Sequence, residues 1–350
     1  MVYLIIDSIV AFKVYCRMSD KQKRRSYTKT TLYINMNSKP VSCPVCQNQS
    51  HYDFSSRDIM FDHYERYDYF KCVNCLSVFQ NPMPSDEKIN SFYPTNYSVF
   101  DAKSQVRKIS LIKEAIYFIK HEYKHLKPNF FFKHIATIVA PLYKTDKPDF
   151  IENGILLDVG CGNGRYLNTM RQLGWNVQGV ELSENGMKVC REANLPVHHG
   201  DLISAKFPDK SFDVITLRHV IEPVRDIHPL MAELARILKP RGKLLIETPN
   251  SQALGRSYCG ANWYANDVPR HLILFSQNSL STLGAEHGLK MFSCRFQTSP
   301  KIILNSLDYI TNNEGTRSKK IAWKRLLARF YIWSAQLRKR GDTIHSVFVK

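Results

Sequence analysis

Residues 156–167 read LLDVGCGNGRYL, and this stretch decides the fold. Its apolar run ends at Asp158 and has the composition of a buried strand. Gly160, Gly162 and Gly164 follow, and glycines let a backbone turn sharply and approach a ligand closely. In open α/β folds, such a turn lies at the carboxyl edge of a parallel sheet, where ligands bind. The stretch therefore predicts a strand, a ligand-binding turn and the start of a helix.

Apolar segments and helical segments alternate on the carboxyl side of this turn. Alternation of this kind predicts a mostly parallel sheet covered on both faces by helices. The expected fold class is α/β, with a Rossmann-like sheet of seven strands behind a small N-terminal cysteine-containing domain. The seven predicted strands lie within residues 154–160, 176–182, 196–201, 212–220, 242–250, 290–296 and 343–349.

Composition divides the chain of 350 residues into four parts. Residues 1–38 are expected to be a disordered leader, or to precede a true translation start at Met36. A loop-rich cysteine unit occupies 39–100, and a linker with helices on either side of Pro128 occupies 101–148. The main domain spans 149–350 and contains a basic helical insertion at about 301–340.

The cysteine content and the net charge limit which cellular compartment and which classes of partner are expected for this chain. No apolar run approaches the roughly 20 residues that span a bilayer, and the opening residues do not read as a signal peptide. Two close cysteine pairs indicate metal in a reducing compartment, so we expect a cytoplasmic protein. The formal charge of +18 attracts polyanions, which leaves nucleic acid, anionic membrane and phosphorylated substrates open.

The turn and two acidic residues indicate a nucleoside ligand without a pyrophosphate. The glycine spacing is GxGxG, whereas the pyrophosphate fingerprint is GxGxxG. Glu181 ends the second predicted strand, where a carboxylate accepts hydrogen bonds from ribose hydroxyls. Asp201 ends the third, where a carboxylate can accept from an adenine amine. The sugar and the base of the ligand thus each have a candidate partner.

Residues 150–350 resemble the class I S-adenosylmethionine (SAM)-dependent methyltransferase superfamily. The texts LLDVGCGNG, FDVI and LKPRGKLLI follow in the family's order and spacing. The resemblance implies that Gly160 and Gly162 contact the methionine part of SAM and that Asp158 orders the glycine loop. It also implies ribose binding by Glu181. The remaining cofactor-binding positions that it implies are Cys161 beside the turn, Leu182 beside Glu181, and Asp201 with Leu202 at the adenine.

Two CxxC pairs predict a structural zinc site in the N-terminal unit. Each pair can present two thiolates in one turn, and two turns complete a tetrahedral site without an open position. A zinc ribbon with this arrangement, followed by FYPTNY and the main domain, resembles a bacterial group associated with glycan or secondary-metabolite pathways. That resemblance implies a sugar, lipid-linked or other small-molecule acceptor. The predicted ligands are Cys43, Cys46, Cys72 and Cys75.

Candidate catalytic residues follow the fourth predicted strand. His219 and Glu222 lie where an acceptor would approach SAM, and His219 is the first candidate for a general base because histidine titrates near neutrality. The alternative is a strand-end histidine that binds the backbone. Related families carry Glu-His where this chain has Glu222-Pro223, so a role that depends on the second histidine is in doubt.

A polar and aromatic segment, ANWYANDVPRHLILFS at 261–276, resembles a motif of the same glycan-associated group. It predicts substrate binding by Trp263, Asp267 and Arg270, with His271 as the alternative base; the competing interpretation is a purely structural loop. The basic insertion that follows is interpreted first as a cap over the active site. Peripheral contact with an anionic membrane at the inner face is the alternative.

The sequence thus favours a SAM-dependent methyltransferase of a small-molecule, sugar or lipid-linked acceptor, with O-methylation expected. Two alternatives remain. One is an rRNA or other RNA methyltransferase, because a zinc ribbon and a basic chain occur there too, although nucleic acid is the less favoured partner. The other is a regulatory protein that binds SAM without catalysis.

Overall fold

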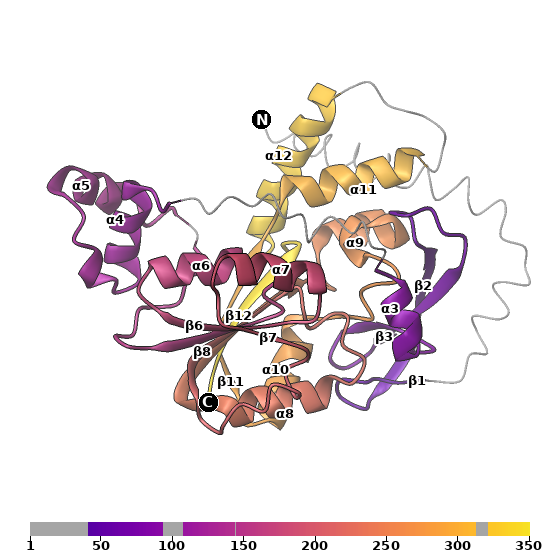
Figure 1. Ribbon diagram of the computed structural model, residues 1–350. Helices are drawn as coiled ribbons and strands as arrows, with labels where there is room; N and C mark the ends of the chain where they lie inside the picture. Colours follow the sequence, from indigo (N-terminus) through magenta and orange to yellow (C-terminus); the bar gives the residue numbers. More distant parts are fainter. Residues whose placement is uncertain (1–40, 94–107, 144, 313–320) are drawn as a thin grey trace, which may run out of the picture.

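The computed structural model describes residues 41–93, 108–143, 145–312 and 321–350. The predicted leader at 1–38 lies outside the described residues. Two sheets organise the described part, a central sheet of seven strands and an N-terminal sheet of five (Figure 1). Among the described residues, no helix is both long enough and apolar enough to cross a membrane.

The central sheet has the strand order β11-β12-β9-β8-β5-β6-β7. Neighbouring strands from β9 to β7 are parallel, and β12 runs antiparallel to both β9 and β11. All seven predicted strands are present. Their bounds are Ile155–Val159 (β5), Asn176–Glu181 (β6), Val197–His199 (β7), Phe212–Arg218 (β8), Leu238–Pro249 (β9), Lys290–Gln297 (β11) and Thr343–Val349 (β12).

The antiparallel strand β12 determines where the basic insertion lies. The last residue of β11, Gln297, pairs with the first residue of β12, Thr343, which in turn pairs with Pro249 at the end of β9. The connection between β11 and β12 therefore leaves and returns at one edge of the sheet. Because β9 is parallel to the strand before the glycine turn, that edge is the carboxyl edge, where ligands of open α/β sheets bind.

Helices cover both faces of the central sheet (Figure 1). On one face, side chains of α6 and α7 pack with Leu156, Val177 and Val214. On the other face, side chains of α8 and α10 pack with Ile215 and Leu217. The bounds of these four helices are Arg165–Gln172 (α6), Glu184–Glu192 (α7), Ile227–Ile237 (α8) and Gln277–Glu286 (α10).

The N-terminal sheet includes one strand from the main domain. Its order is β1-β2-β3-β4-β10, and β10 pairs antiparallel with β4. The cysteine-containing unit and the segment around Arg270 are therefore joined by a shared sheet, which the sequence pattern did not predict. The bounds are Val41–Ser42 (β1), Gln49–Arg57 (β2), Arg66–Cys72 (β3), Val78–Gln80 (β4), Ile273–Leu274 (β10) and, for the short helix that follows β4, Asp86–Ser91 (α3).

Two further groups of helices complete the fold. Helices α4 (Leu111–Lys120) and α5 (Phe130–Val139) lie on either side of Pro128, as predicted, and form a hairpin beside α6 (Figure 1). The insertion forms α11 (Pro300–Asn312) and α12 (Ile321–Leu337), which share a small core with α9 (Leu254–Cys259). Short 3-10 turns lie at Lys124–Leu126 (η2), Gly260–Asn262 (η3) and Tyr264–Asn266 (η4).

Candidate functional site

The glycine turn after β5 adopts a backbone that requires glycine. Gly160, Gly162 and Gly164 have φ values of +64°, +57° and +69°, which side-chain-bearing residues rarely adopt. A Cβ atom on Gly160 would also lie 2.5 Å from Cγ2 of Val220, which follows β8. The turn is thus pressed against the segment that carries His219, and position 160 has no room for a side chain.

Glu181 is fixed beside this turn by two backbone donors. One carboxylate oxygen accepts a hydrogen bond of 2.6 Å from the N–H of Gly162, and the other accepts one of 2.8 Å from the N–H of Ser183. The residue is buried at the end of β6. The geometry therefore brings the predicted ribose partner and the glycine turn into direct contact at the carboxyl edge.

The other predicted cofactor residues lie around the same edge in different environments. Asp201 is exposed and accepts a 2.6 Å hydrogen bond from the N–H of Ser204, while the adjoining Leu202 is buried. Leu182 is exposed. Cys161 is buried, and its sulfur lies in the core behind the turn, close to Gly179. Only the backbone of Cys161 is therefore placed to face a ligand in the turn.

The side chain of Asp158 contacts two residues of β8. The hydroxyl of Thr216 donates a 2.6 Å hydrogen bond to its carboxylate, and Nη2 of Arg218 lies 3.6 Å from the other oxygen. Burial raises the pKa of Asp158, and the charge of Arg218 partly offsets this effect. The described contacts thus tie the end of β5 to β8.

Four titratable side chains form a chain of contacts next to the turn. Nδ1 of His219 lies 3.4 Å from Glu222, and Nε2 lies 3.6 Å from Glu247. The second oxygen of Glu247 lies 3.8 Å from Nδ1 of His345 on β12. Glu247 and His345 were not predicted from the sequence, because they meet only through the pairing of β9 with β12, which the long α11–α12 connection brings together.

The backbone and the charge of His219 both depart from ordinary values. Its φ is +56°, a strained conformation for a non-glycine residue that is concentrated at functional sites. Partial desolvation lowers the pKa of His219, whose side chain is still half exposed, but the interactions with Glu222 and Glu247 outweigh this effect and raise the pKa to about 10. The imidazole is thus positively charged at pH 7 in the described arrangement.

Glu222 is the buried member of this group. Its side chain is fully buried, and neither carboxylate oxygen has a hydrogen-bond partner in the described part of the chain. Burial raises its pKa, but His219, with a smaller contribution from His271, lowers it to a net value below the usual one. The buried negative charge of Glu222 is consequently stabilised by the positive charge of His219.

The predicted substrate loop is held from behind by buried contacts. Trp263 and Arg270 are each 1% exposed. Arg270 binds Asp267 within the loop and Asp58 in the β2–β3 connection, and Nδ1 of His271 bonds the carbonyl oxygen of Ala265 at 3.1 Å. The side chains of Trp263 and Arg270 therefore do not face solvent. Any contribution that they make to acceptor binding acts through the shape of the loop.

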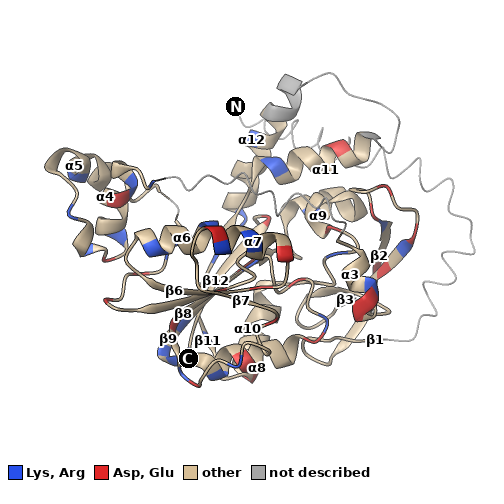
Figure 2. Cartoon of the chain, in the orientation of Figure 1, with Lys and Arg blue, Asp and Glu red and all other residues tan. Residues whose placement is uncertain are grey.

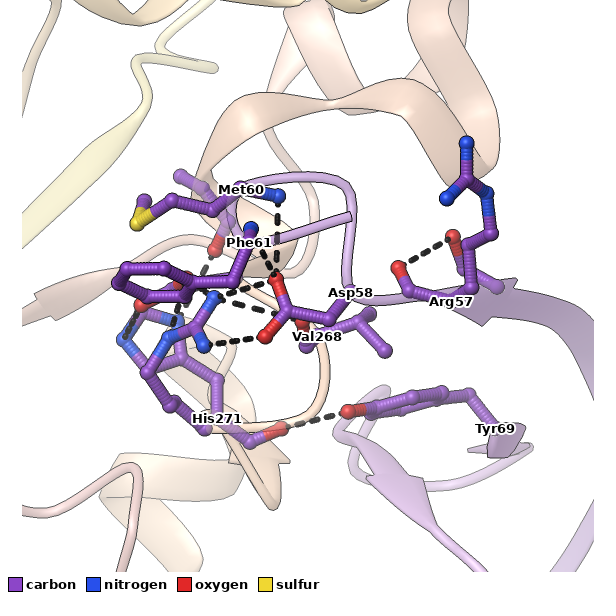
Figure 3. Close-up of polar contacts among 11 residues, drawn as sticks. Arg57, Asp58, Met60, Phe61, Tyr69, Val268 and His271 are labelled. Atoms are coloured by element: carbon purple, nitrogen blue, oxygen red, sulfur yellow. Dashed lines mark hydrogen bonds and ion pairs between the residues drawn. The ribbon is translucent and has the colours of Figure 1, made fainter. Parts of the chain in front are cut away.

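The N-terminal unit contacts this loop at several points (Figure 3). The hydroxyl of Tyr69 donates a 3.0 Å hydrogen bond to the carbonyl oxygen of His271. Asp58 also accepts hydrogen bonds from the backbone N–H groups of Met60 and Phe61. Sequence analysis missed Asp58. A buried aspartate 212 positions from its partner leaves no local signal in a single sequence.

The four predicted zinc ligands come together in one cluster. Their sulfur atoms all lie within 4.8 Å of one another, and those of Cys43 and Cys75 are 3.6 Å apart and those of Cys46 and Cys72 are 3.5 Å apart. Tetrahedral zinc with Zn–S bonds of about 2.3 Å requires sulfur separations of about 3.8 Å. The donor set and its spacing therefore fit a four-thiolate zinc site. The cluster comprises Cys43, Cys46, Cys72 and Cys75.

Comparison with known proteins agrees with this geometry. Residues 120–293 match the family model described as a methyltransferase domain. The match covers the glycine turn, Glu181 and His219. Together with the seven-stranded Rossmann-like sheet, the match identifies a methyltransferase domain within this part of the chain.

Curated relatives carry a more specific name. The chain is 30% identical over 127 residues to the ubiquinone biosynthesis O-methyltransferase of Bartonella quintana. This match covers 34% of this chain and 51% of the relative. The chain is 35% identical over 128 residues to the protein of that name from Thiobacillus denitrificans, 33% of this chain and 53% of the relative. The matched part is thus about half of each relative.

The solved structures found to be similar to this chain include a SAM-dependent methyltransferase from Archaeoglobus fulgidus. It is 19% identical, has a TM-score of 0.42, and the match covers 63% of this chain and 93% of the other. Another is a chain in the structure of a complex between the Haloferax volcanii Trm112 methyltransferase activator and a methyltransferase. The sequence identity is 17% and the TM-score is 0.44, and the match covers 68% of this chain and 93% of the other.

Proposed function

We propose that this protein transfers a methyl group from SAM to an oxygen atom of a small-molecule acceptor. The observation that carries the proposal is the position of His219. It stands between two carboxylates at the carboxyl edge of the sheet, and the adjoining Val220 touches the glycine turn. A methyl donor in the turn and an acceptor beside His219 would then be neighbours.

The predicted cofactor residues fit the parts of SAM. The N–H groups and open space of the turn suit the methionine part, Glu181 suits the ribose hydroxyls, and Asp201 with Leu202 suits the adenine. SAM supplies an electrophilic methyl group on a sulfonium, which leaves as a neutral thioether when the carbon–sulfur bond breaks. The protein must chiefly hold the acceptor oxygen in line with that methyl group and exclude water.

An oxygen acceptor must lose a proton as the new carbon–oxygen bond forms. His219 is the proposed general base, with Glu222 orienting it, and His271 is the alternative base. Because the two carboxylates raise the pKa of His219 to about 10, the imidazole accepts a proton only after it has lost its own. We therefore propose that acceptor binding separates His219 from Glu247, whose side chain is partly exposed.

The names of the relatives support oxygen as the acceptor atom. A sugar or a lipid-linked intermediate is the acceptor class that the arrangement of ribbon and methyltransferase domain favours. The loop with Trp263, Asp267 and Arg270 would form one wall of the acceptor site, positioned by the N-terminal unit. Zinc held by the four cysteines would stabilise that unit and take no part in the chemistry.

An experiment with labelled methyl groups tests the proposal. Purified protein is incubated with methyl-labelled SAM and, separately, a small-metabolite extract, a lipid extract and total RNA. Label in an alkali-stable ether of a small molecule or lipid is the expected result. Label in RNA alone would favour the RNA methyltransferase, for which the net charge of +18 is the specific argument. SAM binding without transfer to any fraction would favour a regulatory protein.

A further inference from the structure

The α4–α5 hairpin carries an apolar stripe on its outer surface. Phe131, Ile138 and Leu142 are 66%, 78% and 85% exposed, and the adjoining Phe130 is 75% exposed. Positions 131 and 138 are seven residues apart, so they lie on one face of α5, and Leu142 lies in the turn that follows the helix. Large apolar side chains that are exposed together, rather than singly, mark an interaction surface.

The stripe is not needed to hold the hairpin together. The opposite face of α5 presents Ala136 and Ala140, which are buried against Ala115 and Ile116 of α4. Tyr117 and Tyr123 attach the hairpin to the main domain, because they belong to the core that contains Trp175. The hairpin thus has its own core and its own attachment, and the exposed stripe remains as an additional feature.

Lysines outnumber acidic residues on the same hairpin (Figure 2). Residues 108–142 contain six lysines and two glutamates, and the next acidic residue after Glu122 is Asp146. One of the glutamates, Glu122, lies 3.4 Å from Lys124. Nζ of Lys124 and Nζ of Lys133 lie 4.9 Å and 5.1 Å from the centre of the Phe118 ring. Lysines and phenylalanines therefore gather on the same hairpin.

We propose that the α4–α5 hairpin binds the surface of an anionic lipid bilayer. Exposed phenylalanine and aliphatic side chains enter the boundary between headgroups and acyl chains, while lysines remain in the headgroup layer and attract anionic lipid. An apolar groove of a protein would instead have to desolvate lysines of the hairpin. The long lysine side chain lets its ammonium group stay in water while its stem lies on the apolar surface.

This surface differs from the basic insertion, for which the sequence left membrane contact as the alternative to a cap over the active site. In α12, Leu327, Ala328 and Tyr331 are buried in the core shared with α9 and α11. The described apolar side chains of that helix are thus partly used in packing. The stripe on α5 has no such role, which makes the hairpin the better candidate for lipid contact.

Sedimentation of the full-length protein with vesicles tests the proposal. The vesicles contain equal parts of phosphatidylglycerol and phosphatidylcholine, and parallel vesicles contain phosphatidylcholine alone. We expect wild-type protein to sediment with the anionic vesicles and to dissociate as salt is raised. The double substitution Phe131→Ser and Ile138→Ser should reduce the bound fraction at least fivefold, and so should Lys127→Glu with Lys133→Glu.

A matched control lies outside the hairpin, on β11. Phe292 on β11 is 74% exposed, and Phe292→Ser should leave vesicle binding unchanged. The thermal unfolding midpoint and the affinity for SAM verify that each variant is folded, and neither depends on lipid. Equal binding of wild type and the stripe variants would overturn the proposal. A change from dimer to monomer in the stripe variants, without vesicle binding by the wild type, would assign the stripe to a second copy instead.

Discussion

The guanidinium of Arg270 donates hydrogen bonds of 2.6 Å and 3.1 Å to the carboxylate of Asp58, although 212 positions separate these residues. Both side chains are buried. The same guanidinium binds Asp267 at 2.7 Å. One buried cation thus connects the N-terminal unit to the loop that follows α9, so the conformation of that loop depends on a residue outside the methyltransferase domain.

Asp58→Ala should destabilise the protein and weaken acceptor binding together. Removing one partner of a buried ion pair leaves the other charge without its partner, which costs about 3–5 kcal/mol, and the remaining Asp267 reduces the loss toward the lower figure. Chemical denaturation measures the stability. In the methyl-transfer assay, we expect a raised KM for the acceptor and an unchanged Kd for SAM.

The exposed pair Glu65–Lys88 supplies the control for this prediction. Both side chains are about half exposed, and exposed pairs contribute at most about 1 kcal/mol. Glu65→Ala should therefore change neither stability nor KM noticeably. If Asp58→Ala changed stability and KM as little as Glu65→Ala, the connection between the N-terminal unit and the loop would not contribute to acceptor binding.

Gly160→Ala should abolish SAM binding for two separable reasons. A φ of +64° strains any other residue, and the added Cβ meets Val220 at 2.5 Å. The positive φ alone costs roughly 1 kcal/mol, so the contact with Val220 is the larger effect. Isothermal titration with SAM should show at least a tenfold loss of affinity.

Two further variants separate strain from contact. Gly288 has a φ of +72°, but a Cβ atom added there would meet no other atom within 4 Å, so Gly288→Ala reports the strain alone and should leave SAM binding intact. Adding Val220→Ala to Gly160→Ala removes the close atom and should restore part of the affinity. Unchanged affinity in Gly160→Ala itself would exclude the turn as the cofactor site.

The sequence predicted the central sheet because each strand and each turn has a local signature. LLDVGCGNG and FDVI signal strands by composition, and the spacing of the cysteines signals their cluster. The direction of β12 has no such signature, since it follows from the pairing of Gln297 with Thr343. The same holds for Glu247 and His345, which meet only because β9 and β12 are neighbours.

The candidate site was accessible from the sequence only where its residues follow the strands directly. Glu181 and His219 stand at strand ends, and the structure places both beside the glycine turn. The polarity of the segment at 261–276 suggested a binding loop, but polarity does not reveal that Arg270 is buried against a carboxylate of the N-terminal unit. Burial of a charged group depends on long-range partners, which one sequence does not display.

Glu222→Gln should lower the pKa of His219 from about 10 toward its usual value near 6.5. The variant removes one of the two negative charges that favour the imidazolium. NMR titration of the His219 ring measures this pKa directly. If His219 is the general base, the rise of kcat/KM with pH should move to lower pH by more than one unit in the variant.

Stability should change with pH in the same window. Because the folded-state pKa of His219 is raised, its contribution to stability is complete below about pH 6.5 and is lost as pH rises toward 10. Glu222→Gln should flatten this dependence. Glu233→Gln is the control, because Glu233 pairs with Arg236 away from the site. If the dependence of kcat/KM on pH were identical in wild type and Glu222→Gln, His219 would be removed from the mechanism.

Removal of zinc should loosen the N-terminal sheet and, through β10, the loop at 261–276. Zinc binding contributes to folding directly when its ligands are brought together only in the folded unit. We expect about one zinc per chain by elemental analysis, and loss of that zinc in Cys46→Ser. Hydrogen exchange should then accelerate in β2, β3 and β10, while β5 and β6 stay protected.

Cys294→Ser, at a free cysteine on β11, should retain zinc and normal exchange. Full protection of β10 in zinc-free Cys46→Ser would show that the sheet is stable without the metal.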